Sequence, residues 1–381
     1  MATTSPPERA EFRLLLALSR PSLTVDEVTE VKQLIDSVGE DLDWGLFIER
    51  ALRHKVFPLV GHHIITYRLF QGDGRTRRIP HPQIYESGHV ANRERNAGLF
   101  EEFGQVIRCF ESSGLRYAVR KGPLIAEHLY RNPALRPMSD LDLLIDRTDA
   151  MAAGELLGAL GYAQGWVDTN GQEVKEFSRR TRAYWRLNLK NELPYVKITH
   201  RDFIESFNVD VCLDIFQSSG AAVTTAELLD RRIEVSVCGT TGSALAPPDQ
   251  FIDLCSHLHK EATSRYYIAA GFDLQILKFL DIALACRQLT EQGLWPGVRE
   301  RARQYGAEAV VYYAMYYAAQ LYPDYVPDAE LAALCHVPFD YLDEYGAMDG
   351  EARRWQEPFW YRLFDIGRGK ALRDTVQLPR T

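Results

Sequence analysis

Two aspartates, Asp140 and Asp142, stand one residue apart within the apolar segment "DLDLLID". Side chains alternate along a β-strand, so these two would share a face, about 7 Å apart along the strand. Leu141, Leu143 and Ile145 would occupy the opposite face and pack into a core. Two neighbouring carboxylates repel each other, and burying them unpaired is costly. Mg²⁺ resolves this conflict, because it prefers oxygen ligands and is typically held by one or two carboxylates together with substrate phosphates.

Two such aspartates also occur at a solvated strand edge or in a helix cap. The sequence around this pair favours a functional site over those two interpretations. Gly122 lies in a turn eighteen residues before Asp140, and a helix-length segment separates them. A third acid, Asp214, lies in the later apolar segment "VDVCLDIF", which also reads as a strand. A glycine turn, a helix, a strand with two aspartates and a distant strand acid are together typical of nucleotidyltransferases.

The segment "VRKGPLIAEHLYRNPALRPMSDLDLLID" resembles the polymerase-β-type nucleotidyltransferase superfamily. Most closely it resembles the bacterial family described as uncharacterised nucleotidyltransferase, and weaker similarity extends over roughly residues 40–285. The resemblance implies an α+β fold: a polymerase-β-like core, built from a small mixed sheet with helices, flanked by N- and C-terminal helical regions.

The resemblance also implies roles for the acids. Asp140 and Asp142 would bind metal ions, and Asp214 would be the third carboxylate, bridging a metal and activating the acceptor. Two Mg²⁺ ions, replaceable by Mn²⁺ and about 3.5–4 Å apart, would clamp an in-line displacement at the α-phosphorus. Asp210 lies four residues before Asp214 on the same predicted strand face and is its rival; the resemblance favours Asp214.

Candidates for nucleotide binding follow from the same resemblance. Gly122 would let the backbone approach the triphosphate, and Lys121 would offer it a cation. Arg136, in the loop before the aspartates, would contact phosphate or pair with an aspartate. The remaining candidates for nucleotide binding are Ser139, Arg186, Lys190 and Lys260.

Two positions depart from the family pattern. Pro123 stands where the superfamily usually has serine, and proline offers phosphate neither a hydroxyl nor an N–H group. Phe216 stands where related sequences often have histidine. These departures motivate one alternative, in which the chain is a catalytically weak nucleotide-binding or scaffold protein.

The stretch "SRRTRAYWRLNLK", residues 178–190, carries five positive charges and no acid, with Tyr184 and Trp185 among them. It would grip a triphosphate, an anionic acceptor or an RNA backbone, with rings available for stacking. The other reading is a solvated β-hairpin, and "AYWRLNL" is a strand candidate. An RNA-binding stretch motivates a second alternative, a toxin-like tRNA nucleotidyltransferase.

The segment "CSHLHKE" places His257 and His259 on different faces of a predicted helix, which argues against metal binding by the pair. His257 and Lys260 share a face. They would border the nucleotide site, or His257 would be a buried structural residue. Asp281, within an apolar helix, would pair with such a cation.

The predicted secondary structure changes twice along the chain. Helical periodicity predicts a helical region over residues 1–95, including a long helix that ends at Gly114 and thus extends past that region. Residues 96–246 read as the nucleotidyltransferase α/β core, with a hairpin in "IEVSVCGTTGSALA" turning on residues 239–242. Residues 247–381 read as a C-terminal helical domain, with Pro247 at its start.

Bulk composition excludes several classes. The 381 residues carry a net charge of −8, which argues against coating nucleic acid through bulk charge. The six cysteines form no C-x-x-C pair and indicate buried thiols in a reducing compartment. No apolar run reaches transmembrane length, so we expect a cytoplasmic protein with no membrane partner. Walker, dinucleotide-binding and G-x-S-x-G motifs are absent.

These features predict a metal-dependent enzyme that transfers a nucleoside monophosphate from an NTP, with ATP among the candidates, to an acceptor and releases pyrophosphate. A small molecule or a peptide is favoured as acceptor over tRNA because the chain is acidic.

Overall fold

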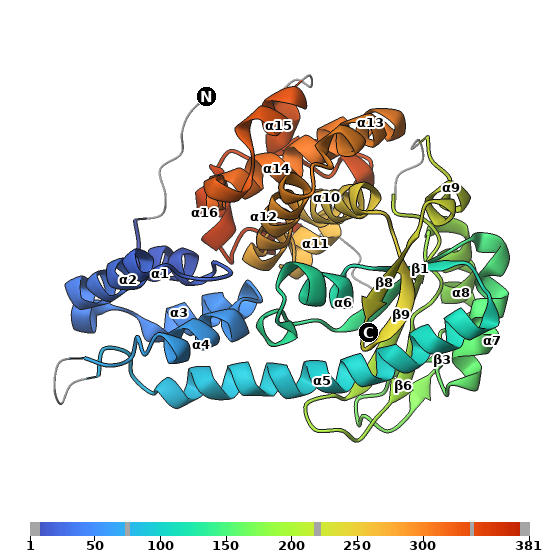
Figure 1. Cartoon of the computed structure of the whole chain (residues 1–381), viewed down its shortest axis with the longest axis horizontal. Helices are drawn as coiled ribbons and strands as arrows, with labels where there is room; N and C mark the ends of the chain where they lie inside the picture. Colours follow the sequence, from blue (N-terminus) through green and yellow to red (C-terminus); the bar gives the residue numbers. More distant parts are fainter. Residues whose placement is uncertain (1–7, 73–76, 217–221, 336–338, 374–381) are drawn as a thin grey trace.

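The computed structural model of the chain describes residues 8–72, 77–216, 222–335 and 339–373. Helices occupy both ends of the chain, and a mixed β-sheet lies between them in sequence (Figure 1). The predicted α+β class is therefore confirmed. No helix within the described ranges is long and apolar enough to cross a membrane.

The N-terminal part consists of helices packed beside one another. Its α-helices are α1 (Ala10–Leu18), α2 (Val25–Val38), α3 (Trp44–Arg53) and α4 (Phe57–Thr66). Helix α2 begins with a capping box, because the Thr24 side chain accepts from the Glu27 N–H while the Glu27 carboxylate accepts from the Thr24 N–H. Thr24 is therefore the N-cap of α2.

The long helix α5 (Pro82–Ser113) connects this part to the sheet (Figure 1). Its 32 residues span about 48 Å. The helix ends as predicted at Gly114, whose φ of 72° is a left-handed conformation that glycine adopts without strain. Position 95, the predicted domain boundary, falls inside α5.

A mixed sheet with strand order β3-β6-β7-β2-β1-β9-β8 forms the centre of the fold. β1 is antiparallel to β2, β2 is parallel to β7, and β8 and β9 form the predicted hairpin. The strands are β1 (Tyr117–Arg120), β2 (Asp140–Ile145), β3 (Ala163–Gln164), β6 (Tyr195–Ile198), β7 (Ser206–Cys212), β8 (Ile233–Val237) and β9 (Thr240–Ala244). Short two-stranded pairs are formed by β4 (Trp166–Val167) with β5 (Val174–Lys175) and by β10 (Glu344–Tyr345) with β11 (Arg353–Arg354).

Helices between the strands cover the sheet and close its loops. They are α6 (Gly122–Leu124), which continues into a π-helical turn at Ile125–Leu129, α7 (Ala150–Ala159), α8 (Arg179–Asn188) and α9 (Thr225–Asp230). The strand or hairpin predicted for the basic stretch is wrong, because residues 179–188 form α8. Ser178 caps this helix by accepting from the Thr181 N–H, a local signal that favours helix over strand.

The C-terminal helices pack above the sheet loops and against the N-terminal helices (Figure 1). They are α10 (Pro247–Thr263), α11 (Arg265–Ala270), α12 (Ile276–Glu291), α13 (Trp295–Tyr305), α14 (Glu308–Leu321), α15 (Asp328–Ala333), α16 (Phe359–Phe364) and α17 (Lys370–Arg373). One apolar core joins them to α1–α4, whereas a second core fills the space between α5, α7 and the sheet. The two helical ends of the chain therefore form one packed unit.

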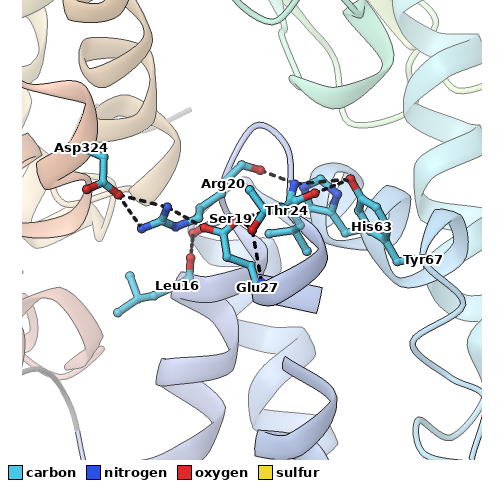
Figure 2. Close-up of polar contacts among 9 residues, drawn as sticks. Leu16, Ser19, Arg20, Thr24, Glu27, His63, Tyr67 and Asp324 are labelled. Atoms are coloured by element: carbon cyan, nitrogen blue, oxygen red, sulfur yellow. Dashed lines mark hydrogen bonds and ion pairs between the residues drawn. The ribbon is translucent and has the colours of Figure 1, made fainter. Parts of the chain in front are cut away.

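Polar contacts fix this packing between the chain's two ends. Figure 2 shows Arg20 between Glu27, at 2.8 Å, and Asp324 of the C-terminal part, at 3.4 Å. The backbone carbonyl of Arg20 contacts Nε2 of His63 at 2.8 Å. The buried Tyr322 hydroxyl donates to the carbonyl of Ser19. These contacts hold the turn after α1 against both α4 and the C-terminal helices.

Candidate active site

Three carboxylates lie on adjacent strands and line one cavity of about 750 Å³. Asp140 and Asp142 are on β2, and Asp210 on the parallel neighbour β7 is the register partner of Asp142. Alternation places the Asp140 and Asp142 side chains on one face of β2, while Leu141 and Leu143 are fully buried on the other.

Burial and mutual repulsion perturb these acids. Burial, and then the Asp142 carboxylate, raises the pKa of Asp140 above its usual value. Burial, followed by Asp142 and Asp140, raises the pKa of Asp210 to about 7. The sheet therefore concentrates negative charge at the cavity floor, which favours the binding of a cation there.

Asp214, the predicted third carboxylate, does not join this group. Strand β7 ends at Cys212, so the alternation that would align Asp214 with Asp210 is lost. The Asp214 carboxylate instead accepts from the Lys190 ammonium at 2.6 Å and from the Phe216 N–H at 2.9 Å. The geometry thus favours the rival, Asp210, and Asp214 closes a loop outside the cavity lining.

The turn after β1 forms a wall of the cavity beside Asp140. Lys121 has a φ of 47°, an unusual conformation for a residue with a side chain, and its ammonium lies 3.9 Å from Asp142 Oδ1. A Cβ on Gly122 would lie 3.1 Å from the Asp140 carbonyl oxygen, so glycine permits this close approach of β1 and β2. The following Pro123 occupies the first turn of α6, where its missing N–H is tolerated.

Helices α10 and α12 supply the wall opposite β2. The Lys121 ammonium donates to His257 Nδ1 at 3.2 Å, so Nε2 of His257 carries the proton and donates to Glu261 at 3.0 Å. Burial, then nearby lysines, lowers the pKa of His257 well below its usual value, so the ring is neutral. Glu261 also pairs with Lys278 of α12. The contacts from Glu261 through His257 therefore orient the Lys121 ammonium.

Lys260 lies on the cavity side of α10, next to His257, as the helical spacing predicted. Burial, followed by Lys121 and Arg120, lowers the pKa of Lys260 to about 8. Its ammonium lies 5.4 Å from the centre of the Tyr267 ring. His259 faces elsewhere and packs edge-on against Tyr313, so the two histidines do not form a pair.

Two buried arginine–aspartate pairs hold the elements that carry the acids. Arg136 donates to Asp281 of α12 through Nε at 3.0 Å and Nη2 at 2.8 Å, and Tyr130 donates to the same carboxylate. Arg136 therefore pairs with an aspartate, the second of its two predicted contacts. Arg120, on β1, donates from Nε to Asp253 of α10 at 2.9 Å. These pairs fix β1 and the loop before β2 to the C-terminal helices.

Of the other predicted nucleotide contacts, one lies inside the cavity lining, one lies outside it, and one has a side chain outside the described residues. Ser139 lines the cavity and hydrogen-bonds the Asp140 carboxylate, which favours its charged form. Lys190 pairs with Asp214. The Arg186 side chain lies outside the described residues. Arg182, in the same helix α8, pairs with Glu176. Helix α8 contributes no residue to the described cavity wall.

The sequence analysis missed Lys55 and Arg95, which reach the cavity from the N-terminal helices. Lys55 follows α3 and has a φ of 57°, and Arg95 lies on α5. Neither stands in a motif, so only the positive charge of each residue could have drawn attention to it. Phe216, by contrast, is buried and packs edge-on against Tyr305, which explains an aromatic residue there by packing.

The donor chemistry of the cavity suits a hard divalent cation. Within the described ranges, no group of three or more His, Cys, Asp or Glu side chains is arranged so that it could hold a metal ion. A complete protein cage is not required, because Mg²⁺ is usually held by one or two carboxylates plus substrate phosphates and water. Asp140, Asp142 and Asp210 supply hard oxygen donors whose repulsion a cation would relieve.

A mixed sheet thus presents carboxylates from neighbouring strands to a cavity that lysines also line. The chain belongs to the family described as uncharacterised nucleotidyltransferase, whose profile matches residues 40–323. Neither the curated proteins nor the solved structures contain a match to it. Family membership confirms the predicted resemblance, and it supports nucleotidyl transfer from an NTP as the general activity.

Proposed function

We propose that the chain is a metal-dependent enzyme that transfers a nucleoside monophosphate from an NTP to a small acceptor and releases pyrophosphate. The observation that carries this proposal is the placement of Asp140, Asp142 and Asp210 on adjacent strands, facing a cavity that Lys121 and Lys260 also line. Such a reaction needs carboxylate oxygens that bind cations, and it needs ammonium groups beside them that bind phosphates. We also propose that the sheet and its helices form a polymerase-β-like core.

Each side of the cavity has a role in this proposal. Lys121 and Lys260 bind the triphosphate, and Gly122 allows its close approach to the backbone. Asp140 and Asp142 would hold Mg²⁺, with Asp210 shared between the metal site and the acceptor. Bound Mg²⁺ would supply charge neutralisation for the triphosphate and the departing pyrophosphate. Asp210 orients the attacking oxygen of the acceptor. The Asp210 carboxylate then accepts the proton of that oxygen.

The remaining residues exclude water and fix the reacting groups. Neutral His257 accepts the hydrogen bond from the Lys121 ammonium and so orients it at the cavity. Arg136 and Arg120 prevent the strands from separating from α10 and α12. Most of the rate acceleration would therefore come from positioning and charge neutralisation.

The test is incubation of the full chain with each α-labelled NTP and Mg²⁺, with and without acceptor pools that include small phosphorylated metabolites, peptides and total tRNA. Wild-type protein should release pyrophosphate and label an acceptor. Asp142→Asn should keep the fold and lose at least about a thousandfold in rate, because charge neutralisation of this kind contributes several kcal/mol. The matched control is Asp146→Asn, a half-buried carboxylate after β2 that lies outside the cavity lining and whose hydrogen bonds among the described residues go to Thr148.

The outcomes separate the alternatives. Retained turnover by Asp142→Asn with Mg²⁺ present would overturn the metal assignment. Label on tRNA would favour a tRNA nucleotidyltransferase. Nucleotide binding without pyrophosphate release across all acceptor pools would favour a binding or scaffold protein.

A further inference from the structure

The cavity has a second cationic side, which comes from the N-terminal helices and not from the sheet. Lys55 and Arg95 line it. Apart from burial, the largest influence on the pKa of each is the Asp140 carboxylate. Lys260 has different neighbours, namely Lys121, Arg120 and Asp142. Lys55 and Arg95 therefore approach the acidic row from the N-terminal helices, whereas Lys121 lies 3.9 Å from Asp142 after β1 and Lys260 lies on α10.

Lys55 and Arg95 take part in no ion pair among the described residues. Among the described residues, the Lys55 ammonium has no hydrogen-bond or ion-pair partner, although burial lowers its pKa. Arg95 donates Nη1 to the carbonyl of Met138, and its other donors have no partner within the described ranges. Lys55 is exposed and Arg95 is half-buried, so both cationic groups remain available to an anionic ligand in the cavity.

Backbone strain at Lys55 points the same way. The residue after a helix in the left-handed region is usually glycine, because a side chain there is sterically disfavoured. Lys55, at φ 57°, keeps a long side chain in that position and directs it to the cavity. Strain of this kind is retained where the side chain has a task that glycine could not perform.

A second hollow of about 610 Å³ adjoins this side of the cavity, and Arg95 lines both. Ser206 and Asn208 of β7 form part of its floor. They alternate on the same strand face as Asp210, and Asn208 is the register partner of Asp140. A continuous polar track therefore runs along β7 from the second hollow to the acidic row.

We infer that Lys55 and Arg95 bind a phosphate group of the acceptor, which is a small phosphorylated molecule that lies along the β7 track. The inference rests on the proposed function and assigns the acceptor class for that site. The volume of the second hollow suits a small ligand. A phosphate at Arg95 would place the rest of the acceptor between the hollow and Asp210, on the side away from Lys121 and Lys260.

The experiment titrates the full chain with inorganic phosphate by isothermal calorimetry, without nucleotide. Wild-type protein should bind phosphate at two sites. Lys55→Gly and Arg95→Gln should each weaken one of them by about tenfold or more, and Lys260→Gln should weaken the other. Arg93→Gln is the matched control on α5, because Arg93 is exposed and pairs with Glu94. It should leave both sites unchanged.

Thermal unfolding separates binding from folding. Lys55→Gly should melt no lower than wild type, because glycine relieves the left-handed strain. Arg95→Lys should restore part of the affinity that Arg95→Gln loses. Unchanged phosphate binding by Lys55→Gly, or loss of one shared site in both Lys55→Gly and Lys260→Gln, would overturn the inference. Displacement of phosphate from the Lys55 site by total tRNA would show an RNA ligand instead.

The calorimetry does not depend on catalysis, so the two proposals fail separately. Absence of pyrophosphate release with every NTP would reject the proposed function while leaving the phosphate site measurable. Normal release together with phosphate binding that ignores Lys55 and Arg95 would reject only the acceptor assignment.

Discussion

Replacing Asp210 by asparagine is expected to stabilise the metal-free protein and to remove most of its stabilisation by Mg²⁺. Burial and the neighbouring carboxylates of Asp142 and Asp140 raise the pKa of Asp210 from 3.8 to about 7. A carboxyl whose pKa is higher in the folded than in the unfolded chain destabilises the fold as pH rises from one value to the other. The penalty is complete above about pH 7 and disappears near pH 4.

The size of this effect follows from the shift. At about 1.4 kcal/mol per pKa unit, ionised Asp210 costs the fold roughly 4 kcal/mol at pH 8. Asp140 and Asp142 share the repulsion, and asparagine retains a buried polar group, so we expect a net gain of about 1–2 kcal/mol. In a chain of 381 residues that gain corresponds to a rise in melting temperature of about 1–3 °C.

The assay is thermal unfolding followed by circular dichroism, at about pH 5 and pH 8, with EDTA or with Mg²⁺. In EDTA at pH 8, Asp210→Asn should have a higher melting temperature than wild type, and the difference should be smaller at pH 5. Mg²⁺ should raise the melting temperature of this variant only weakly. Asp214→Asn breaks the pair with Lys190 and should show no such gain while keeping the Mg²⁺ response. A lower melting temperature for Asp210→Asn in EDTA at pH 8, or equal Mg²⁺ shifts in both variants, would refute the reasoning.

Two further predictions concern residues around the acidic row. Because burial lowers the pKa of Lys260 to about 8, NTP affinity should fall as pH rises through about 8 and the ammonium loses its proton; Lys260→Arg should flatten this profile in a fluorescence titration, and a flat wild-type profile would contradict the assignment. Arg136→Ala should lower the unfolding free energy by about 3–5 kcal/mol, because Asp281 remains buried and unpaired. Urea denaturation measures this loss, which Arg136→Met combined with Asp281→Leu should partly recover.

Much of the sheet could be predicted because its signals are local. Alternation in "DLDLLID" predicts one polar and one apolar face, and β2 has both. The glycine turn after β1 and the hairpin β8–β9 are likewise written in short stretches of sequence. The long helix ending at Gly114 follows from periodicity and a left-handed cap.

The third carboxylate could not be chosen from the sequence because the choice depends on where a strand ends. Asp210 and Asp214 would share a face of a strand that continued through both. The chain leaves β7 at Cys212, where Asp214 turns to Lys190 and the Phe216 N–H. Register then sets Asp210 beside Asp142, a long-range relation that no local pattern records.

The cations from the N-terminal helices were missed for a related reason. Lys55 and Arg95 reach the site through the packing of α3 and α5 around the sheet loops, and the positive φ of Lys55 has no signature in residue type. The basic stretch drew attention through its charge, yet α8 lies outside the cavity wall that the structure describes. A high density of charged residues in the sequence is therefore a poorer guide to the site here than the isolated cations that the fold brings to the cavity.

The central claim is tested most directly by locating a metal. Crystals of the full chain grown with Mn²⁺ and a non-hydrolysable NTP analogue would show the ion by its anomalous scattering. The account predicts a peak held by Asp140 and Asp142, with Asp210 adjacent and the triphosphate against Lys121 and Gly122. A peak at Asp214, or a bound nucleotide with no metal near Asp140 and Asp142, would contradict it.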